Sequence, residues 1–414
     1  MAGLVAMTIV AATTWQATGT FLVALEEEFQ WPRTVLALAF SLSRTEGAVM
    51  GPVEGWLTDK LGGRLTMLIG FLVCGTGFFL FVGVRDPLTF YGAYLVITIG
   101  AGLAGFIPMM TIINYWFVRN RTRAMALMFV GGSLGGTLNP LLAWGIENYG
   151  WRWTAGGIGA FYMLVTLPIV IVIRDRPEKY GLRPDGDPPE MRDESQTRLP
   201  NLSHRSVAAY DYTVRQAVRT RAFWIISITH ACSATVFSAM TVHLVPFLTD
   251  QGLSLTTAAF PVLVMALTAG VFQLVGGWMG DRMDKRYVVI GFMIVHGFGT
   301  LFLLLVNRLS LALTFAVLSG IGHGGRGPAT ASMRGDYFGR KSFGTIFGLS
   351  ALPMNIGSIV VPLLMGVAFD LTNSYRASFL VLGILILLGA CLMLFLRPPE
   401  PPPSVHRTLE AKVK

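Results

Sequence analysis

Apolar runs of about twenty residues recur along the chain, and short polar or charged segments separate them. An α-helix of about twenty apolar residues is long enough to cross a hydrocarbon core about 30 Å thick. The pattern therefore predicts an all-α membrane protein with twelve membrane-spanning helices, at residues 4–25, 34–57, 65–84, 88–116, 124–146, 153–173, 222–248, 257–279, 287–306, 310–337, 343–369 and 376–396.

The longest polar stretch, residues 174–221, lies between the sixth and the seventh predicted helix. It has too few apolar residues to bury a core of its own. We therefore predict a six-helix bundle at 1–173 and a second one at 222–396, joined by this linker. The remaining residues, 397–414, open with a proline-rich run and are predicted to be disordered.

Composition supports lipid as the main solvent. Hydrophobic residues make up 53% of the chain and charged residues only 13%, whereas soluble domains carry about 25% charged residues. The net charge of +9 comes from short basic clusters between apolar runs, with no aromatic-interleaved patch, so we do not expect a nucleic-acid partner. Cys74, Cys232 and Cys391 all lie in apolar segments, and their spacing predicts no metal site or disulfide.

Basic residues are distributed unevenly between the two sets of loops. The loops that follow the odd-numbered predicted helices hold only five basic residues, Arg33, Arg85, Arg152, Arg308 and Arg376. Basic residues are enriched in cytoplasmic loops, so we predict a multi-pass protein of the inner (plasma) membrane with both termini in the cytoplasm. The predicted cytoplasmic side carries the basic residues of the linker and the tail together with Lys60, Arg64, Arg119, Arg121, Arg123, Arg282, Lys285, Arg286, Arg334, Arg340 and Lys341.

The two predicted bundles can be superposed in sequence with one constant offset of 222 residues. The matched positions include Gly55-Trp56 with Gly277-Trp278, Asp59-Lys60 with Asp281-Arg282, Tyr115-Trp116 with Tyr337-Phe338, and Pro140-Leu141-Leu142 with Pro362-Leu363-Leu364. Each half has an even number of spans, so the repeats are parallel and are related by an axis along the membrane normal.

The loop after the second helix reads Gly55-x-x-x-Asp59-Lys60-x-Gly62-Gly63-Arg64, and its second copy reads Gly277-x-x-x-Asp281-Arg282-x-Asp284-Lys285-Arg286. This pattern resembles the signature of the major facilitator superfamily, although the family has a basic residue where Gly63 stands. A carboxylate at a helix end near arginines can form a charge network that breaks when the halves rock apart. The predicted cytoplasmic gate consists of Asp59, Lys60, Arg64, Glu54, Asp281, Arg282, Arg286, Arg334 and Asp336.

Three further segments resemble the monocarboxylate transporter-like and oxalate/formate antiporter-like branch of that superfamily. They are Glu28-Phe29-x-Trp31-x-Arg33, Tyr115-Trp116-Phe117 with the basic run 119–123, and Tyr337-Phe338-Gly339-Arg340. The resemblance implies transport of small organic anions, often carboxylates, by proton symport or anion exchange. Two features of the branch are missing, since residues 257–279 hold no arginine and residues 4–24 hold no basic residue. The anion-binding cation must therefore be sought elsewhere.

The tenth predicted helix carries the most informative charge. Its centre, Gly320-Ile321-Gly322-His323-Gly324-Gly325-Arg326-Gly327-Pro328, is glycine-rich, and we expect its backbone to be loosened there. Arg326 matches Ala104 in the other half. Because a guanidinium binds a carboxylate bidentately, Arg326 is a candidate substrate contact, with a structural cation as the alternative. His323, one turn earlier, is a second candidate.

The second predicted helix carries Arg44 and Glu46 at membrane depth, where a charge costs at least about 2.5–3.5 kcal/mol. Arg44 is a candidate second anion contact, and Glu46 is the candidate for proton coupling; structural ion pairs are the alternative for both. Weaker candidates for substrate contact are Trp15, Gln16, His230 and His243.

These observations predict a secondary transporter that acts as a monomer on a small organic anion together with a proton or a counter-anion. The sequence shows no nucleotide-binding loop, nucleophile–base pair or metal cluster, so we expect neither enzymatic activity nor a cofactor. Two alternatives stay open: an exporter of lipophilic or cationic compounds, and a transporter-like sensor without flux.

Overall fold

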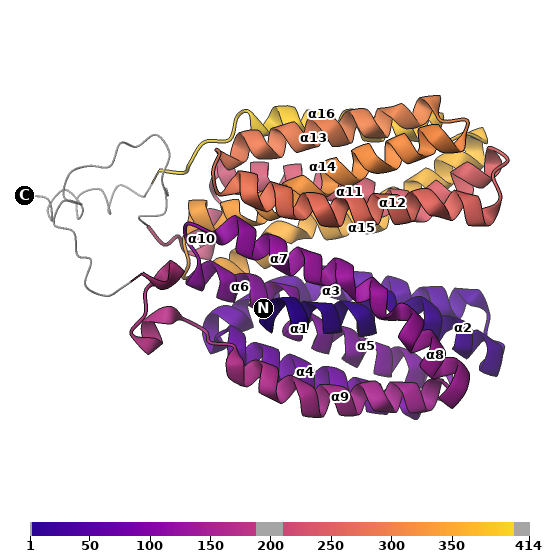
Figure 1. Cartoon of the computed structure of the whole chain (residues 1–414), viewed down its shortest axis with the longest axis horizontal. Helices are drawn as coiled ribbons and strands as arrows, with labels where there is room; N and C mark the ends of the chain where they lie inside the picture. Colours follow the sequence, from indigo (N-terminus) through magenta and orange to yellow (C-terminus); the bar gives the residue numbers. More distant parts are fainter. Residues whose placement is uncertain (1, 188–209, 401–414) are drawn as a thin grey trace, which may run out of the picture.

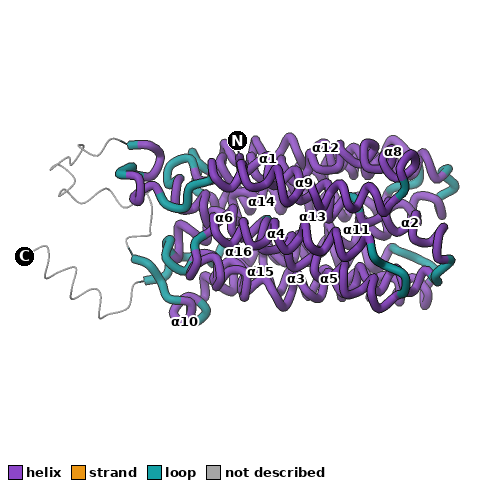
Figure 2. The backbone as a smooth tube through the Cα atoms, turned by 90° about the horizontal axis from the view of Figure 1, so that it is seen from below, coloured by secondary structure: helices purple, strands orange, loops and turns teal. Residues whose placement is uncertain are grey.

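The computed structural model describes residues 2–187 and 210–400, and within these ranges every regular element is a helix. The helices run nearly parallel and form two groups that lie side by side (Figure 1). Seen from below, the helices run along the long axis of the molecule, and the loops lie at the two ends of the bundle (Figure 2). The predicted all-α membrane fold is confirmed.

The N-terminal half consists of six helical passes, several of which are built from more than one element. They are α1 (Ala2–Val10) with the π-helix η1 (Ala11–Gln16) and α2 (Thr18–Phe29); α3 (Arg33–Leu61); α4 (Gly63–Val82); α5 (Pro87–Ala104) with α6 (Phe106–Trp116); α7 (Arg121–Leu134) with η2 (Gly135–Leu138) and α8 (Asn139–Tyr149); and α9 (Trp151–Val172).

The C-terminal half has six passes as well, and most of them are single long helices. They are α11 (Arg221–Asp250), α12 (Leu255–Gly280), α13 (Lys285–Phe302) with η6 (Leu303–Leu305), α14 (Leu309–Phe338), α15 (Phe343–Thr372) and α16 (Arg376–Met393). The described parts of the linker contain the short elements η3 (Pro177–Tyr180), η4 (Pro184–Gly186) and α10 (Val214–Ala217).

Each of the twelve predicted spans lies on one of these passes. Among the described residues, eight helices are long and apolar enough to cross a membrane. Large apolar side chains also face outward, as at Leu164 and Leu371, which are 71% and 79% exposed. Outward-facing apolar residues of this kind are what a bilayer solvates.

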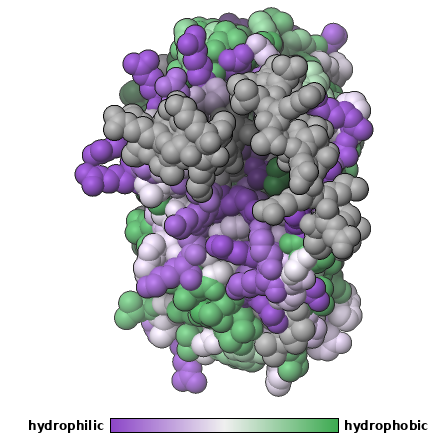
Figure 3. All heavy atoms as spheres, turned by 90° about the vertical axis from the view of Figure 1, so that its left-hand side faces the viewer, coloured by the Kyte–Doolittle hydropathy of each residue, from purple (hydrophilic) through white to green (hydrophobic). Residues whose placement is uncertain are grey.

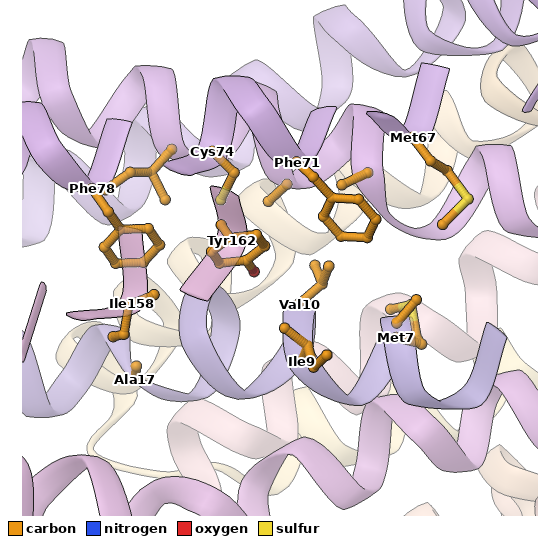
Figure 4. Close-up of a cluster of buried hydrophobic side chains, with 14 of the residues drawn as sticks. Met7, Ile9, Val10, Ala17, Met67, Phe71, Cys74, Phe78, Ile158 and Tyr162 are labelled. Carbon is orange, nitrogen blue, oxygen red and sulfur yellow. The ribbon is translucent and has the colours of Figure 1, made fainter. Parts of the chain in front are cut away.

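Each half packs around its own hydrophobic cluster. In the N-terminal half, side chains from α1, α4 and α9 interlock around Phe71, Phe78 and Tyr162 (Figure 4). The Tyr162 hydroxyl is buried and lies 2.6 Å from the Thr13 hydroxyl. A buried hydroxyl costs little free energy when it is hydrogen-bonded. The contact with Thr13 therefore allows Tyr162 to pack in the core.

Loop chemistry sets where some passes begin. Asp86 caps the N-terminus of α5 and accepts hydrogen bonds from the backbone of Leu88 and of Thr89, both at 3.0 Å. The bonds from the Thr89 backbone and hydroxyl hold the pKa of Asp86 below its usual range. A reciprocal cap of this kind fixes the entry of the chain into the helix.

The glycine-rich centre of α14 is not loosened, contrary to the sequence-based expectation. The helix is continuous from Leu309 to Phe338. A Cβ on Gly324 would lie 2.2 Å from the carbonyl oxygen of Ala269, and one on Gly322 would lie 2.4 Å from the Cβ of His296. The glycines therefore allow α12 and α13 to pack closely on α14. The interruption falls instead in the matching pass of the other half, at Gly105 between α5 and α6.

Candidate functional site

The two halves are fastened at the end of the bundle that holds Lys60, Arg119, Arg282 and Arg340, called the basic end below. Asp59 lies in the last turn of α3, and its side chain contacts the N-terminus of α15 in the other half. Its carboxylate accepts bonds from the backbone of Gly344 (2.9 Å) and Thr345 (2.8 Å) and from the Thr345 hydroxyl (2.6 Å). A helix N-terminus carries free N–H groups and partial positive charge, so a carboxylate there is stabilised.

The second copy of the motif makes the same contact in the opposite direction. Asp281, at the end of α12, accepts bonds from the backbone of Thr122 (2.9 Å) and Arg123 (3.1 Å) at the N-terminus of α7. The 222-residue offset relates both the two carboxylates and the two pairs of donors. We call these contacts the Asp59 latch and the Asp281 latch.

The motif glycines bring the helices close enough for the latches to form. A Cβ on Gly55 would lie 2.2 Å from the carbonyl oxygen of Gly344, and one on Gly277 would lie 2.5 Å from the Cβ of Ala126. Glycine at a helix crossing lets two backbones approach. Each glycine lies one turn before its aspartate, so close packing and the latch occur at the same crossing.

A third contact between the halves centres on Asp336 of α14. Arg121 of α7 lies 2.5 Å from one carboxylate oxygen, and Lys285 of α13 pairs with the other. Arg121 is 3% exposed, so the pair is largely shielded from water. The sequence suggested Arg334 as a neighbour of Asp336, but in the structure Arg121 and Lys285 neutralise this carboxylate.

The other residues of the predicted gate contact their own half or the linker. Lys60 and Arg282 stack on Trp56 and Trp278, at 4.8 Å and 4.3 Å from the ring centroids. Arg286 donates to the carbonyl of Leu396. The backbone of Arg64 donates to Asp175 of the linker at 2.6 Å. Glu54 is buried against Gly102 of α5 rather than joined to the latches; a Cβ on Gly102 would lie 1.9 Å from its carboxylate oxygen.

Arg326 lies inside the C-terminal half and is 1% exposed. Its Nε donates to the Ser233 hydroxyl at 2.6 Å, and its Nη1 lies 3.0 Å from Nδ1 of His230. Ser233 also contacts Nδ1 of His296 at 2.7 Å. Among the described residues no carboxylate forms an ion pair with Arg326, so this buried guanidinium is held by neutral groups.

Arg334 is a second buried cation on α14, also 1% exposed. Its Nε donates to the Ser350 hydroxyl, its Nη1 donates to the Thr330 carbonyl at 3.0 Å, and the guanidinium stacks 4.6 Å from the Phe347 ring centroid. Its Nη2 is buried and has no hydrogen-bond partner within the described ranges. The structure therefore moves Arg334 from the predicted gate into the interior of the C-terminal half.

The predicted histidines differ in their surroundings. The His323 ring stacks on Phe237 with centroids 3.7 Å apart, and its Nδ1 is buried without a partner among the residues described. His243 is bonded locally, with Nε2 2.9 Å from the Pro362 carbonyl and Nδ1 3.3 Å from the Tyr375 hydroxyl. His323 therefore has an unused ring nitrogen, whereas His243 has partners on both sides.

The remaining candidates lie in the N-terminal half. The side chains of Trp15, Gln16 and Arg44 lie outside the described residues, although η1 and α3 carry their backbone. Glu46 of α3 is described, and its Oε1 is buried without a hydrogen-bond partner in the described part of the chain.

Sequence comparison decides the family. A family model described as Major Facilitator Superfamily matches residues 4–270 and 248–413. The chain belongs to the major facilitator superfamily. It is therefore a secondary transporter and not an enzyme, as the sequence predicted.

Relatives within the superfamily place the chain near two kinds of transporter. It is 26% identical to human monocarboxylate transporter 11 over 383 residues, which cover 88% of this chain and 75% of the relative. It is 27% identical to the probable nitrate/nitrite transporter NarK2 of Mycobacterium tuberculosis (strain H37Rv) over 379 residues, with 86% and 85% covered. The predicted monocarboxylate transporter-like resemblance is confirmed.

Solved structures show the same fold. The E. coli fucose:proton symporter FucP matches with a TM-score of 0.72 at 15% identity, over 96% of this chain and 98% of that one. The human organic anion transporter MFSD10 matches with a TM-score of 0.69 at 18% identity, over 95% and 97%.

Sequence reasoning missed several residues of this superfamily member's polar interior. Ser233 and His296 hold the Arg326 region. His296 lies in an apolar run as His230 and His243 do, but nothing in a single sequence shows which of these residues turn towards Arg326, and an isolated serine gives no signal. The latch donors could have been found, because Thr122 and Gly344 obey the same offset as Asp281 and Asp59. Backbone N–H groups leave no trace in residue identity, which is why the search for side-chain partners overlooked them.

Proposed function

We propose that this major facilitator transports a small organic anion whose recognised group is a carboxylate. Arg326 and Arg334 would supply the binding charge in the C-terminal half, and Arg44 would be the contact from α3. We further propose that the protein works as a monomer in the inner membrane with both termini in the cytoplasm. The basic end then faces the cytoplasm, which agrees with the orientation predicted from the uneven distribution of basic residues.

The observation that carries this proposal is the pair of buried arginines without a counter-ion. A charge removed from water costs several kcal/mol unless a partner compensates it. Arg326 and Arg334 are both 1% exposed, and no described carboxylate pairs with either. Nη2 of Arg334 even lacks a hydrogen bond within the described residues. A transported anion that binds between the helices would supply the negative charge that these two arginines of α14 lack.

The relatives support the same chemistry. The two relatives are named for transport of monocarboxylates and of nitrate or nitrite. Carboxylate and nitrate are both planar oxyanions, and a guanidinium fork matches such groups with two parallel hydrogen bonds. An organic carboxylate is the anion we propose, and inorganic nitrate is the alternative that the transport test resolves.

The latches support alternating access around this site. Both join one half to the other at the basic end, so rocking the halves apart there must break them. Rocking of one repeat against the other around a central site is the mechanism expected of parallel repeats. In the described arrangement the basic end is closed, and we propose that this state binds substrate from the opposite side.

Counterflow in proteoliposomes tests the proposal. Purified protein would be reconstituted with unlabelled lactate, pyruvate, formate, oxalate or nitrate inside, and uptake of the labelled anion would be measured. We expect exchange of at least one carboxylate. Replacing either buried arginine, Arg326→Gln or Arg334→Gln, should reduce this exchange at least tenfold, since a hydrogen bond to a charged group is worth about 1.5–3 kcal/mol.

The matched control is Arg308→Gln, which removes an exposed arginine from a loop at the other end. Its exchange should equal that of the unmodified protein. Size-exclusion profiles and melting temperatures separate loss of binding from loss of folding, and Arg326→Lys provides a variant that keeps the charge. Uptake of a lipophilic cation without any carboxylate would refute the anion proposal, and exchange of nitrate alone would refute its carboxylate part.

A further inference from the structure

A cavity of about 840 Å³ lies at the basic end, outside the proposed transport site. Three parts of the chain form its walls. The N-terminal half contributes Trp56, Asp59, Lys60 and Tyr115, the linker contributes Arg176, Glu178, Lys179, Asp211 and Val214, and the C-terminal half contributes Arg340, Lys341, Ser342 and Thr345. Hydrophilic residues gather across the middle of this face, between the two halves (Figure 3).

The acidic residues of this cavity are already engaged. Asp59 binds the N-terminus of α15, as the Asp59 latch. Asp211 accepts bonds from the backbone of Arg340 (2.6 Å) and Lys341 (3.2 Å). Glu178 lies 3.0 Å from Nη1 of Arg340. The carboxylates therefore hold the walls together and leave other cations of the cavity uncompensated.

Several cations lining the cavity have no acidic partner among the described residues. Lys179 and Lys341 are exposed and form no ion pair there. The ammonium of Lys60 lies over the face of Trp56, and Nη2 of Arg176 donates to the neutral hydroxyl of Tyr115 at 2.9 Å. Five basic residues and three acidic ones line the cavity. A concave site with an excess of one sign of charge concentrates ions of the opposite sign.

We propose that this cavity is a regulatory site for a ligand that carries two or more phosphate groups. Lys60, Arg176, Lys179 and Lys341 would bind the phosphates. Ammonium and guanidinium groups are the side chains that recognise phosphate oxygens. The volume exceeds what a small carboxylate needs, and the site lies at the end of the bundle rather than near Arg326. The ligand is therefore distinct from the transported anion.

Binding at this site stabilises the closed arrangement of the basic end. Its cations belong to both halves and to the linker, and rocking apart at this end would separate Lys60 from Lys341. A ligand that contacts both walls binds the closed state more tightly than the open one. It therefore shifts the population towards the closed state, by an amount set by the difference between the two binding free energies. A polyphosphate at this face therefore inhibits transport without competing for the substrate.

Melting of the purified full chain in detergent gives a readout that does not depend on the transported anion. The probe is tripolyphosphate, compared with sodium sulfate at the same ionic strength. We expect a saturable rise in melting temperature with tripolyphosphate, and at least tenfold weaker binding in the double variant Lys179→Gln/Lys341→Gln. The matched control is Arg219→Gln, an exposed linker arginine that does not line the cavity.

Flux measurements test the regulatory part. Tripolyphosphate on the side of the basic end should lower the maximal rate of exchange, and excess substrate should not restore that rate, because the ligand favours a state that the transport cycle must leave. The double variant should resist this effect. Repeating the melting experiment in nanodiscs with and without phosphatidylglycerol distinguishes the phosphate sources. If anionic lipid alone occupies the site, it reproduces the shift and blocks the effect of tripolyphosphate.

Three results would overturn the proposal: a melting shift no larger than that of sulfate, equal tripolyphosphate affinity in the double variant, or saturable binding without inhibition. The first two results are melting measurements and do not depend on whether a carboxylate is the substrate, whereas the third needs an anion whose exchange can be measured. Failure of the carboxylate exchange test, conversely, would leave the melting result intact.

Discussion

At the scale of single residues, the polar interior of the C-terminal half depends on how Arg326 is positioned. Ser233 connects Arg326 to His296, with bonds of 2.6 Å and 2.7 Å to the two side chains. The hydroxyl therefore fixes both the guanidinium and the imidazole. A side chain that orients a binding group contributes to affinity without touching the ligand.

Replacing this hydroxyl, Ser233→Ala, should raise the substrate concentration for half-maximal exchange about tenfold, because one hydrogen bond to a charged group is lost. The maximal rate should change little. The control is Ser227→Ala on the same helix, where the buried hydroxyl bonds only to the Phe223 carbonyl of its own helix. Equal half-maximal concentrations in both variants would contradict the positioning role.

Glu46 is the residue whose replacement tests proton coupling. Its buried Oε1 has no hydrogen-bond partner among the described residues, as expected of a carboxyl group that carries or releases a proton during transport. Glu46→Gln should abolish accumulation driven by a pH gradient and leave exchange of substrate for substrate intact. The control is Glu147→Gln, at an exposed position of α8. Full gradient-driven accumulation in Glu46→Gln would exclude this residue and leave anion exchange as the simpler mechanism.

At the scale of elements, the crossings of α3 with α15 and of α12 with α7 depend on glycine. Added methyl groups at Gly55 or Gly277 would overlap atoms of the other half. Overpacking of a tight contact costs typically about 1–3 kcal/mol. The cost applies only while the basic end is closed, since the overlapping atoms belong to different halves.

Gly55→Ala and Gly277→Ala should therefore shift the protein towards the state open at the basic end. Labelling of a cysteine introduced between the halves would measure this shift, with an increase in rate of about 5- to 150-fold for about 1–3 kcal/mol. The chain offers matched controls on the same two helices, Gly47→Ala and Gly270→Ala, because an added Cβ meets nothing within 4 Å at either position. Equal labelling in all four variants would show that the crossings tolerate the extra atoms.

At the scale of the whole molecule, the two latches form one symmetric fastening. Each carboxylate comes from one half and each helix N-terminus from the other. Asp59→Asn and Asp281→Asn keep the shape of the side chain and remove its charge. Each should increase amide hydrogen exchange at its own donors, Gly344 and Thr345 or Thr122 and Arg123, by about tenfold, given about 1.5–3 kcal/mol for a charged hydrogen bond.

The double variant distinguishes independent latches from coupled ones. If the halves open as rigid bodies, either single variant also increases exchange at the donors of the other latch, and the double variant adds to both. Exchange that rises only beside the mutated aspartate would indicate local fraying and would contradict a rigid-body opening. Amides in the last turns of α4, at the end of that helix away from the Asp59 latch, serve as the internal reference.

The sequence was sufficient to predict the twelve passes and the family, because hydrophobic length and the repeat offset are properties of residue identity. It was misleading for α14, where glycine indicated a loosened helix, since the same residue serves close packing when neighbouring helices lie against it. It also misplaced Arg334, because sequence position near a helix end does not tell which way a long side chain turns. The polyphosphate cavity was beyond prediction, since three distant segments form it.

The reciprocal form of the latches has a consequence for assembly. The N-terminal half contains both the carboxylate Asp59 and the donors Thr122 and Arg123, so two copies of that half have every group needed to close both contacts. The same holds for the C-terminal half. The latches alone therefore do not discriminate between correct pairs and pairs of identical halves. The linker resolves this ambiguity, because tethering raises the effective concentration of the correct partner to the millimolar range. If the protein were split at the linker, its halves would have to recognise each other through contacts that only the correct pair can make, such as the ion pair of Arg121 with Asp336.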